Sequence, residues 1–415
     1  MMKYKRWVAL GWMGLLLQAC GGGGGGSSIG PVGTGGSTPL PVFASSFENK
    51  GISTLTSSLV PKLSLIVDAA QLNGRDSVPE SLAVADFQRS GSYSAFVVAS
   101  SPTVDPTADK GRVFFLSQSG TVWTDISSRL FVSNSDREAC ARPQQALVSD
   151  LNGDGKPDVY LACAAAALVS QYLYLSRADG AYEMRRTSDM ASHIRLDAMG
   201  AAIGFVDGDS IPDIVSTDNG SLVVMLGEVS AGQYTLKAHE PGRLPVIPAA
   251  PSGARSVFLL PRTTLTPGSA ITTTRHDLLV GGNGTQGSPV AWYRNNSGYF
   301  NPTDALKVRQ YAAVAGDANN RYDYVENDRY GYLYVTDSSS NDVVRMWRIE
   351  KPDDSGTSTS LAQYSPDTAS AGDWPARVRL AGSYLVPFDA GCPLTVTLDN
   401  ASRCGKRYPV SVFGP

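Results

Sequence analysis

The stretch Ser149–Ala162, "SDLNGDGKPDVYLA", packs three aspartates, one asparagine and two glycines into nine residues. A run of β-branched, aromatic and aliphatic residues follows directly after Asp158. Turn-forming residues placed immediately before such a run are typical of a tight turn that enters a β-strand. With the apolar residues that precede Ser149, the stretch predicts two strands joined by an acidic turn.

The same plan recurs elsewhere in the chain. Ser81–Ser100 and Ala201–Gly220 each contain an apolar strand, a polar turn with glycine and a second apolar strand, and Arg275–Gly284 matches the second half of the unit. A further strand that ends in a polar turn follows each of them. Apolar first strands recur at about 55 to 66 residues, a spacing that suits four strands per unit. They begin near Leu82, Ala146, Ala201, Ser256, Tyr311 and Arg377.

This repetition predicts an all-β fold, a β-propeller of four-stranded antiparallel blades that spans residues 41–415. Radial blades bury the faces of neighbouring sheets and leave only short edges. Six units can be counted and the span leaves room for another, so we expect six or seven blades, with seven favoured. A β-sandwich is the alternative, although it does not require the same turn in successive units. Charged residues make up only 18% of the chain and there are 42 glycines, which fits short strands and many turns.

The acidic turn and the strand and turn that follow it, "YLYLSRADGAYE", resemble the FG-GAP or VCBS repeat of integrin α-chain propellers and of many bacterial surface proteins. The resemblance is clearest over residues 81–300 and weakens afterwards, where the turn in Ala315–Glu350 is longer. In integrin-like propellers the calcium loops lie on the face away from the ligand. The resemblance therefore implies a structural role for the acidic turn.

The spacing of oxygen-bearing residues in this turn predicts a structural calcium site. Asp150, Asn152, Asp154 and Asp158 occupy positions 1, 3, 5 and 9 of a loop, and the main-chain carbonyl of Lys156 occupies position 7. Gly155 allows the sharp bend between them. Leu161 stands where an EF-hand places its glutamate, so no flanking helices are implied. The alternative is an Asp/Asn turn that binds no ion.

Two sister turns are degraded copies. Asp207, Asp209 and Asp213 supply a weaker second calcium site, because Phe205 replaces the first ligand. In the first unit only Asp86 remains, so we expect that turn to be held by hydrogen bonds alone.

The first forty residues predict export and a lipid anchor. Residues 1–19 have a basic start and a short apolar segment, and "LQAC" ends at Cys20, which resembles the lipobox of bacterial lipoproteins. Residues 20–40 are a glycine-rich tether. Gly21 after the lipidated cysteine implies the outer membrane, on its periplasmic or surface-exposed side. A secretory signal or an uncleaved anchor is the alternative.

The other cysteines are even in number, as expected for an oxidising compartment. They are Cys140, Cys163, Cys392 and Cys404. Of the three possible pairings we expect the local one, Cys140 with Cys163 and Cys392 with Cys404, because short loops close at the least entropic cost. Four free thiols are the alternative.

We find no catalytic constellation in the sequence. The three histidines, His193, His239 and His276, are scattered, which disfavours zinc and histidine-based nucleophilic catalysis. We expect His276 to cap a turn or to face solvent. The net charge of the chain is −3, so its composition does not indicate a basic surface of the kind that binds nucleic acid. Aromatic residues gather in the later units and either pack between sheets or form a recognition surface. The candidates for that surface are Trp292, Tyr330, Trp347 and Trp374.

Together these features predict a cell-surface adhesion or binding module that recognises a protein or glycan through propeller loops. Its cofactor would be structural calcium, and it would reach the membrane through the lipid anchor at Cys20. A polysaccharide-cleaving enzyme, a lyase or a glycosidase, on the same calcium-stabilised scaffold is the first alternative. An envelope assembly scaffold is the second. Fold resemblance alone does not decide among these.

Overall fold

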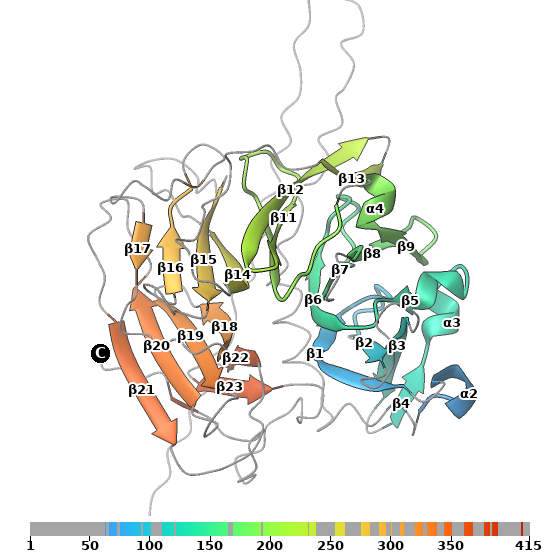
Figure 1. Ribbon diagram of the computed structural model, residues 1–415. Coiled ribbons are helices and arrows are strands. Elements are labelled where there is room, and N and C mark those ends of the chain that lie inside the picture. The colour runs from blue at the N-terminus through green and yellow to red at the C-terminus, as the bar shows by residue number, and fades with distance from the viewer. Residues whose placement is uncertain are drawn as a thin grey trace, which may run out of the picture. The chain divides into compact units, whose positions relative to one another are not determined.

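The computed structural model shows an all-β protein made of several antiparallel sheets (Figure 1). It describes residues 63, 66–72, 75–92, 94–100, 110–119, 122–164, 169–191, 194–230, 232–237, 254–261, 275–282, 290–295 and 300. Beyond these it describes strands at 308–310, 320–326, 330–337, 344–350, 361–367, 377–381, 384–388 and 408–409. The chain divides into Met1–Thr38 and Pro39–Pro415, and every described residue belongs to the second unit.

The first three sheets contain the clearest sequence repeats. Sheet one orders β1 (Asp76–Ala85), β2 (Ser94–Ser100), β3 (Gly111–Ser119) and β4 (Val122–Asp125), and short β5 (Glu138–Ala139) pairs with β3. Sheet two orders β6 (Pro143–Ser149), β7 (Asp158–Cys163), β8 (Tyr172–Ser176) and β9 (Tyr182–Arg186). Sheet three orders β10 (Ala201–Gly204), β11 (Asp213–Asp218), β12 (Ser221–Ser230) and β13 (Gln233–Lys237).

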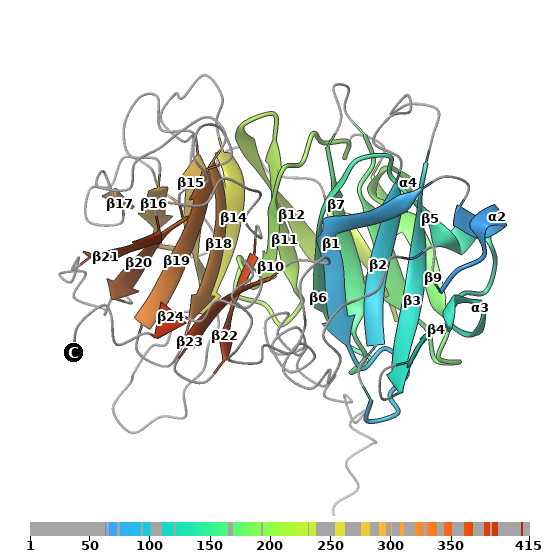
Figure 2. The same cartoon turned by 90° about the horizontal axis from the view of Figure 1, so that it is seen from below.

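Three further sheets follow in chain order. Sheet four orders β14 (Ala254–Pro261), β15 (His276–Gly282), β16 (Val290–Tyr293) and β17 (Val308–Gln310). Sheet five orders β18 (Asn320–Glu326), β19 (Tyr330–Asp337), β20 (Val344–Glu350) and β21 (Leu361–Asp367). Sheet six orders β22 (Arg377–Ala381), β23 (Tyr384–Phe388) and β24 (Tyr408–Pro409). In Figure 2 the strands of each sheet run side by side.

Short helices lie between or before these strands. They are α2 (Ala69–Leu72), α3 (Ser127–Leu130), the 3₁₀ turn η2 (Ser135–Arg137) and α4 (Thr187–Met190). None of the helices in the described part of the chain is long and apolar enough to cross a bilayer.

The predicted first strands agree with the observed ones at five of six positions. Leu82, Ala146, Ala201, Ser256 and Arg377 lie in the first strands of sheets one, two, three, four and six. The position near Tyr311 was wrong, because sheet five begins at β18 (Asn320–Glu326) and Tyr311 lies outside the described residues. The first strands of consecutive sheets contact each other, from β1 with β6 through to β18 with β22.

Alternating side chains give the second and third sheets two apolar faces each, and the two faces of a sheet join different cores. On β7, Leu161 packs toward Phe96 and Phe115 of sheet one, whereas Tyr160 packs toward Ile203 and Met225 of sheet three. This follows from the period of two along a strand. Each fully buried aliphatic or aromatic side chain contributes on the order of 1.5–3 kcal/mol. Because cores lie on both faces, the second strands of sheets one, two and four are buried along their whole length.

Candidate functional site: the acidic turn and the groove beside it

Two glycines and one aspartate shape the turn between β6 and β7. Gly153 and Gly155 have φ angles of +76° and +75°, a left-handed conformation that glycine adopts without strain. The Asp150 carboxylate is buried and accepts main-chain N–H bonds from Gly153 at 2.8 Å, Asp154 at 3.0 Å and Gly155 at 2.7 Å. Burial raises the pKa of Asp150, although these hydrogen bonds oppose the shift. The turn thus folds around one carboxylate.

Asp158 closes the same turn from its other end. Its Oδ2 accepts the main-chain N–H of Leu151 at 2.8 Å and of Asn152 at 3.2 Å, and its Oδ1 accepts that of Ser176 at 2.6 Å. Complete burial raises the pKa of Asp158 to about 8, with the Ser176 hydrogen bonds opposing. Asp158 therefore ties the turn to the end of β8.

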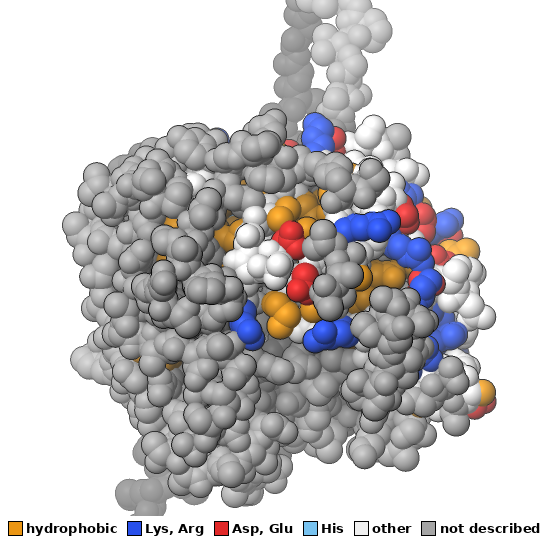
Figure 3. All heavy atoms as spheres, in the orientation of Figure 1, with side chains coloured by type: hydrophobic (Ala, Val, Ile, Leu, Met, Phe, Trp, Pro, Cys, Tyr) orange, Lys and Arg blue, Asp and Glu red, His pale blue; other side chains and the backbone are white. Residues whose placement is uncertain are grey.

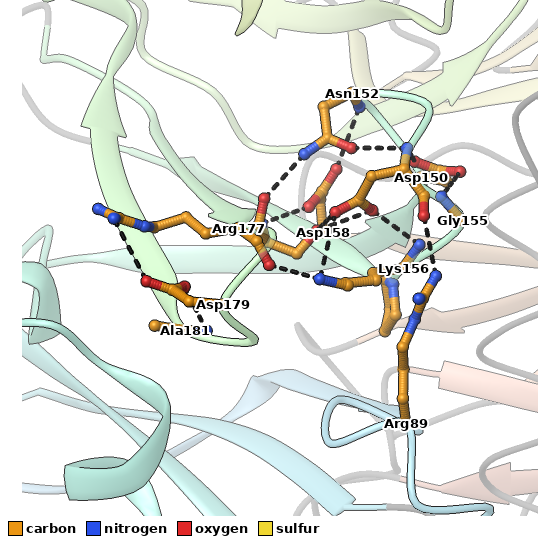
Figure 4. Close-up of polar contacts among 12 residues, drawn as sticks. Arg89, Asp150, Asn152, Gly155, Lys156, Asp158, Arg177, Asp179 and Ala181 are labelled. Atoms are coloured by element: carbon orange, nitrogen blue, oxygen red, sulfur yellow. Dashed lines mark hydrogen bonds and ion pairs between the residues drawn. The ribbon is translucent and has the colours of Figure 1, made fainter. Parts of the chain in front are cut away.

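Asp154 ties the exposed side of the turn to its neighbours, and Figure 4 shows Arg89, Asn152 and Lys156 gathered around the turn. Ser176 Oγ donates to the Asp154 carboxylate at 3.1 Å, and Lys156 Nζ lies 3.7 Å from Asp154 Oδ2. Arg89, from the turn after β1, donates through Nη2 to the Asp154 main-chain oxygen at 2.9 Å. Asn152 Nδ2 donates to the Ser176 carbonyl at 2.9 Å. Side chains of two sheets therefore meet at this turn.

The second acidic turn repeats the closing contact. Asp213 is buried and accepts the main-chain N–H of Val206 at 2.6 Å, Asp207 at 3.3 Å and Gly227 at 2.9 Å. Burial, followed by the charge of Asp207, raises the pKa of Asp213 to about 7. Asp209 makes contacts within the turn, accepting the Ile211 N–H at 2.8 Å and donating its main-chain N–H to Asp207 Oδ1 at 3.0 Å.

The first-unit turn contains hydrogen bonds to its one remaining aspartate. The Asp86 carboxylate accepts the main-chain N–H of Ser90 at 3.0 Å and of Gly91 at 2.8 Å. Both hydrogen bonds lie within the turn.

A third closing aspartate was missed from the sequence. Asp277, near the start of β15, accepts the Asn295 main-chain N–H at 2.9 Å and the Trp292 indole N–H at 3.2 Å. Its place at the beginning of a second strand matches Asp158 and Asp213. The sequence "RHDLLV" does place an aspartate directly before an apolar strand, but the turn before it lacks the other acidic residues of the first turn.

The donor set of the first turn fits calcium by chemistry, since it offers carboxylate, amide and carbonyl oxygens at alternate positions. In the conformation described, Asp150 and Asp158 direct their oxygens at main-chain amides. Within the described ranges, no group of three or more His, Cys, Asp or Glu residues is arranged to hold a metal ion. A calcium ion would be held by Asp150, Asn152, Asp154, the Lys156 carbonyl and Asp158, and would supply the positive charge that these buried carboxylates lack.

A groove of about 650 Å³ opens beside the acidic turn. It is formed by residues of sheets one, two and three and of their turns. Its charged side chains come from Arg89, Asp154, Lys156, Arg177, Glu183 and Arg185. Arg177 lies 3.3 Å from Asp179, and Arg185 Nε donates to Glu183 at 2.9 Å. Figure 3 shows Lys and Arg side chains, with Asp and Glu among them, gathered over the part of the chain that carries β8 and β9.

The structure corrects two predicted recognition residues. Trp292 and Trp347 are 4% and 1% exposed and pack in one core between sheets four and five, so neither forms part of a surface. Alternation along β16 and β20 turns their rings toward the neighbouring sheet. No side-chain placement is described for Tyr330, and Trp374 lies outside the described residues.

His276 is also not where the sequence placed it. Its side chain is completely buried at the start of β15, and its Nδ1 accepts the main-chain N–H of Phe205 at 2.9 Å. Burial lowers the pKa of His276 to about 4. The imidazole is a core residue, because sheet three covers the end of β15.

Cys140 and Cys163 form a disulfide, one half of the expected local pairing. Cys20, Cys392 and Cys404 lie outside the described residues, as do His193 and His239.

Comparisons with known proteins add little to this site. No protein-family model and no curated protein matches the chain. The rhamnogalacturonan lyase YesW is 12% identical, with a TM-score of 0.35, over 80% of this chain and 67% of that one. A Bacillus licheniformis rhamnogalacturonan lyase is 12% identical, with a TM-score of 0.34, over the same shares. The V. cholerae biofilm matrix protein Bap1 is 11% identical, with a TM-score of 0.28, over 76% of this chain and 64% of that one. Because these scores lie below 0.5, the proposals below rest on the chain's own residues.

Proposed function

We propose that the protein is a lipid-anchored binding module of the cell envelope that recognises an acidic glycan in the groove beside the acidic turn. The groove carries the proposal: its volume of about 650 Å³ falls within the roughly 300–1,000 Å³ typical of ligand sites. Four basic side chains line it against two acidic ones, Asp154 and Glu183. Such a surface suits carboxylate groups spaced along a sugar chain.

The scaffold of this module is proposed to be a β-propeller of FG-GAP or VCBS type with six or seven blades. Consecutive four-stranded antiparallel sheets with contacting first strands support this arrangement. Calcium in the first acidic turn, and more weakly at Asp207, Asp209 and Asp213, is proposed as a structural cofactor. Cys20 is proposed as the lipidated residue that places the protein at the outer membrane.

The groove's basic residues are positioned to contact a ligand. Arg177 is 44% exposed at the β8–β9 turn and Arg185 is 25% exposed on β9. The hydrogen bonds among described residues use only the Nε of Arg185. Its terminal nitrogens therefore remain as donors for a bidentate contact to a carboxylate.

The test is retention of purified protein on an immobilised uronate polysaccharide, with neutral dextran as the reference. We expect retention on the uronate matrix only. Arg177→Gln and Arg185→Gln should each weaken it by about tenfold, the equivalent of one charge-assisted hydrogen bond. Arg129→Gln is the matched control, because Arg129 is exposed, carries the same charge and lies off the groove.

Two results would reject this function. Equal loss of retention in all three variants would mean general ion exchange. Shortening of the uronate polymer by purified protein would establish the polysaccharide-cleaving alternative instead.

A further inference from the structure

A second cavity, of about 200 Å³, lies on sheet one, away from the proposed glycan groove. It opens where β3 begins and pairs with β5, since Arg112 lies opposite Glu138 in the register. Its charged and polar side chains come from Arg75, Lys110, Arg112, Asn134, Arg137 and Glu138. Four of these six are basic.

Arg137 is buried at the wall of this cavity with part of its guanidinium unused. The residue is 5% exposed, and its Nη2 has no hydrogen-bond partner. Its other nitrogens make long contacts, Nη1 to Gln71 at 3.3 Å and Nε to the Val113 carbonyl at 3.5 Å. The same Nη2 lies 3.6 Å from Asp125 Oδ2, close enough for an ion pair but too far for a hydrogen bond. A buried donor without a partner is costly.

Arg112 adds a second unsatisfied guanidinium to the same cavity. Its Nε is buried without a hydrogen-bond partner, and its Nη2 donates to Asn134 at 3.2 Å. The positive charge of Arg112 also acts against that of Arg137, because both charges face one small space. Two like charges with unused donors are unfavourable unless an anion lies between them.

Glu138, the acidic side chain that lines the cavity, already forms ion pairs with two other basic residues. Glu138 pairs with both Lys110 and Arg186 through Oε1. Among the described side chains of the cavity, no carboxylate therefore remains to neutralise Arg112 and Arg137 together. The backbone around them is fixed, since Gly111 donates to the Cys140 carbonyl at 3.1 Å and Cys140 is disulfide-bonded.

We propose that this cavity binds an oxyanion of sulfate or phosphate type, either as the free ion or as an ester group on a larger ligand. Guanidinium groups present planar pairs of donors that match such oxygens. The volume admits one anionic group and excludes a polymer segment of the kind proposed for the groove. This site goes beyond the proposed glycan recognition and does not depend on it.

The experiment measures the melting temperature of the folded protein in sodium sulfate, sodium phosphate and sodium chloride at constant ionic strength. We expect a saturable rise with sulfate or phosphate over chloride. Arg112→Gln should weaken the apparent affinity by about tenfold, as expected for loss of a charge-assisted contact. Lys110→Gln is a second variant, because Lys110 is 54% exposed and its replacement does not endanger folding.

Arg129→Gln, which removes the same charge from an exposed site, should leave the response unchanged. A response that does not saturate, or that is equal in all variants, would overturn the proposal and indicate an adventitious ion only. Tighter binding of a sulfated monosaccharide than of inorganic sulfate would assign the anion to an ester, and weaker binding would assign it to the free ion. Arg112→Gln should not alter retention on the uronate matrix. The anion cavity and the glycan groove can therefore be tested, and rejected, independently of each other.

Discussion

At the scale of single residues, the chain uses buried aspartates to join strands. Asp158, Asp213 and Asp277 each stand at or next to the start of a second strand and accept a main-chain N–H from the third strand or from just beyond it. In sheet one the corresponding residue is Ser94, whose Oγ lies 3.4 Å from the Ala85 carbonyl. A carboxylate can accept several amides at once, whereas a hydroxyl satisfies fewer. Asp158 and Asp213 therefore bind more main-chain amides than Ser94 does, across turns of the same length.

His276 gives a prediction about pH at this scale. Its pKa is lowered by burial to about 4, against about 6.5 in an unfolded chain. As pH falls from 6.5 to 4, the unfolded state takes up the proton first, so stability is lost over that interval. The loss attributable to His276 is on the order of 3 kcal/mol. Urea unfolding of the wild type and of His276→Gln at several pH values checks it.

The wild type must be compared with His276→Gln because the buried aspartates change the unfolding free energy with pH in the opposite direction to His276. Their raised pKa values favour the folded state as pH falls, and both proteins share that contribution. On acidification from pH 6.5 to 4, the unfolding free energy of His276→Gln should therefore fall less, or rise more, than that of the wild type. Identical slopes would show that His276 does not titrate as a buried neutral base.

At the scale of elements, the β6–β7 turn combines a self-sufficient hydrogen-bond network with a donor set suited to calcium. Asp150 and Asp158 already satisfy main-chain amides, so the turn can form without an ion. Their burial nevertheless makes the charged form costly. A bound cation would offset that cost.

We predict that calcium raises the melting temperature of the protein and that a chelator lowers it. Asp154→Asn should reduce this response, because it removes a charge from the turn while Asp158 keeps its amide contacts. Asp179→Asn is the control, since Asp179 is an exposed acidic residue of the next turn. The measurement is thermal unfolding with calcium and with chelator. A calcium response that is absent, or that survives Asp154→Asn intact, would leave the turn as a hydrogen-bonded loop only.

At the scale of the whole molecule, stability comes from cores between consecutive sheets. Leu161 is fully buried and shares its core with Phe96 and Phe115 of sheet one. Trp292 shares another core with Trp347 of sheet five. Sheets two, three and four therefore each need a neighbouring sheet to bury their apolar faces.

Leu161→Ala should destabilise the whole described β-domain by about 2–5 kcal/mol, because the side chain leaves a cavity between two sheets. Val122→Ala is the control, since Val122 is 63% exposed. Urea unfolding followed by circular dichroism and by tryptophan fluorescence should give one coincident transition, shifted to lower urea in Leu161→Ala. Two separate transitions would show that the sheets unfold independently.

The sequence alone determined the strands, the repeat and the acidic turns. Turn residues, left-handed glycines and alternation act over a few neighbouring residues, so Gly155 and the start of β7 could be predicted from "SDLNGDGKPDVYLA". The observed strands follow that pattern in sheets one to four. The prediction that a sheet begins near Tyr311 was wrong, because β17 (Val308–Gln310) is the last strand of sheet four and the next sheet begins at β18.

Only the tertiary structure decided which side chains meet. Arg89, Arg177 and Gln233 line one groove although they lie on three different sheets. Trp292, Trp347 and His276 are buried because a neighbouring sheet covers the face on which they stand. Nothing in the local sequence distinguishes such a covered face from an exposed one. Burial is a property of the packed pair of sheets, and the groove forms only where three sheets meet. The Arg112–Arg137 cavity forms where the pairing of β3 with β5 brings residues distant in sequence together.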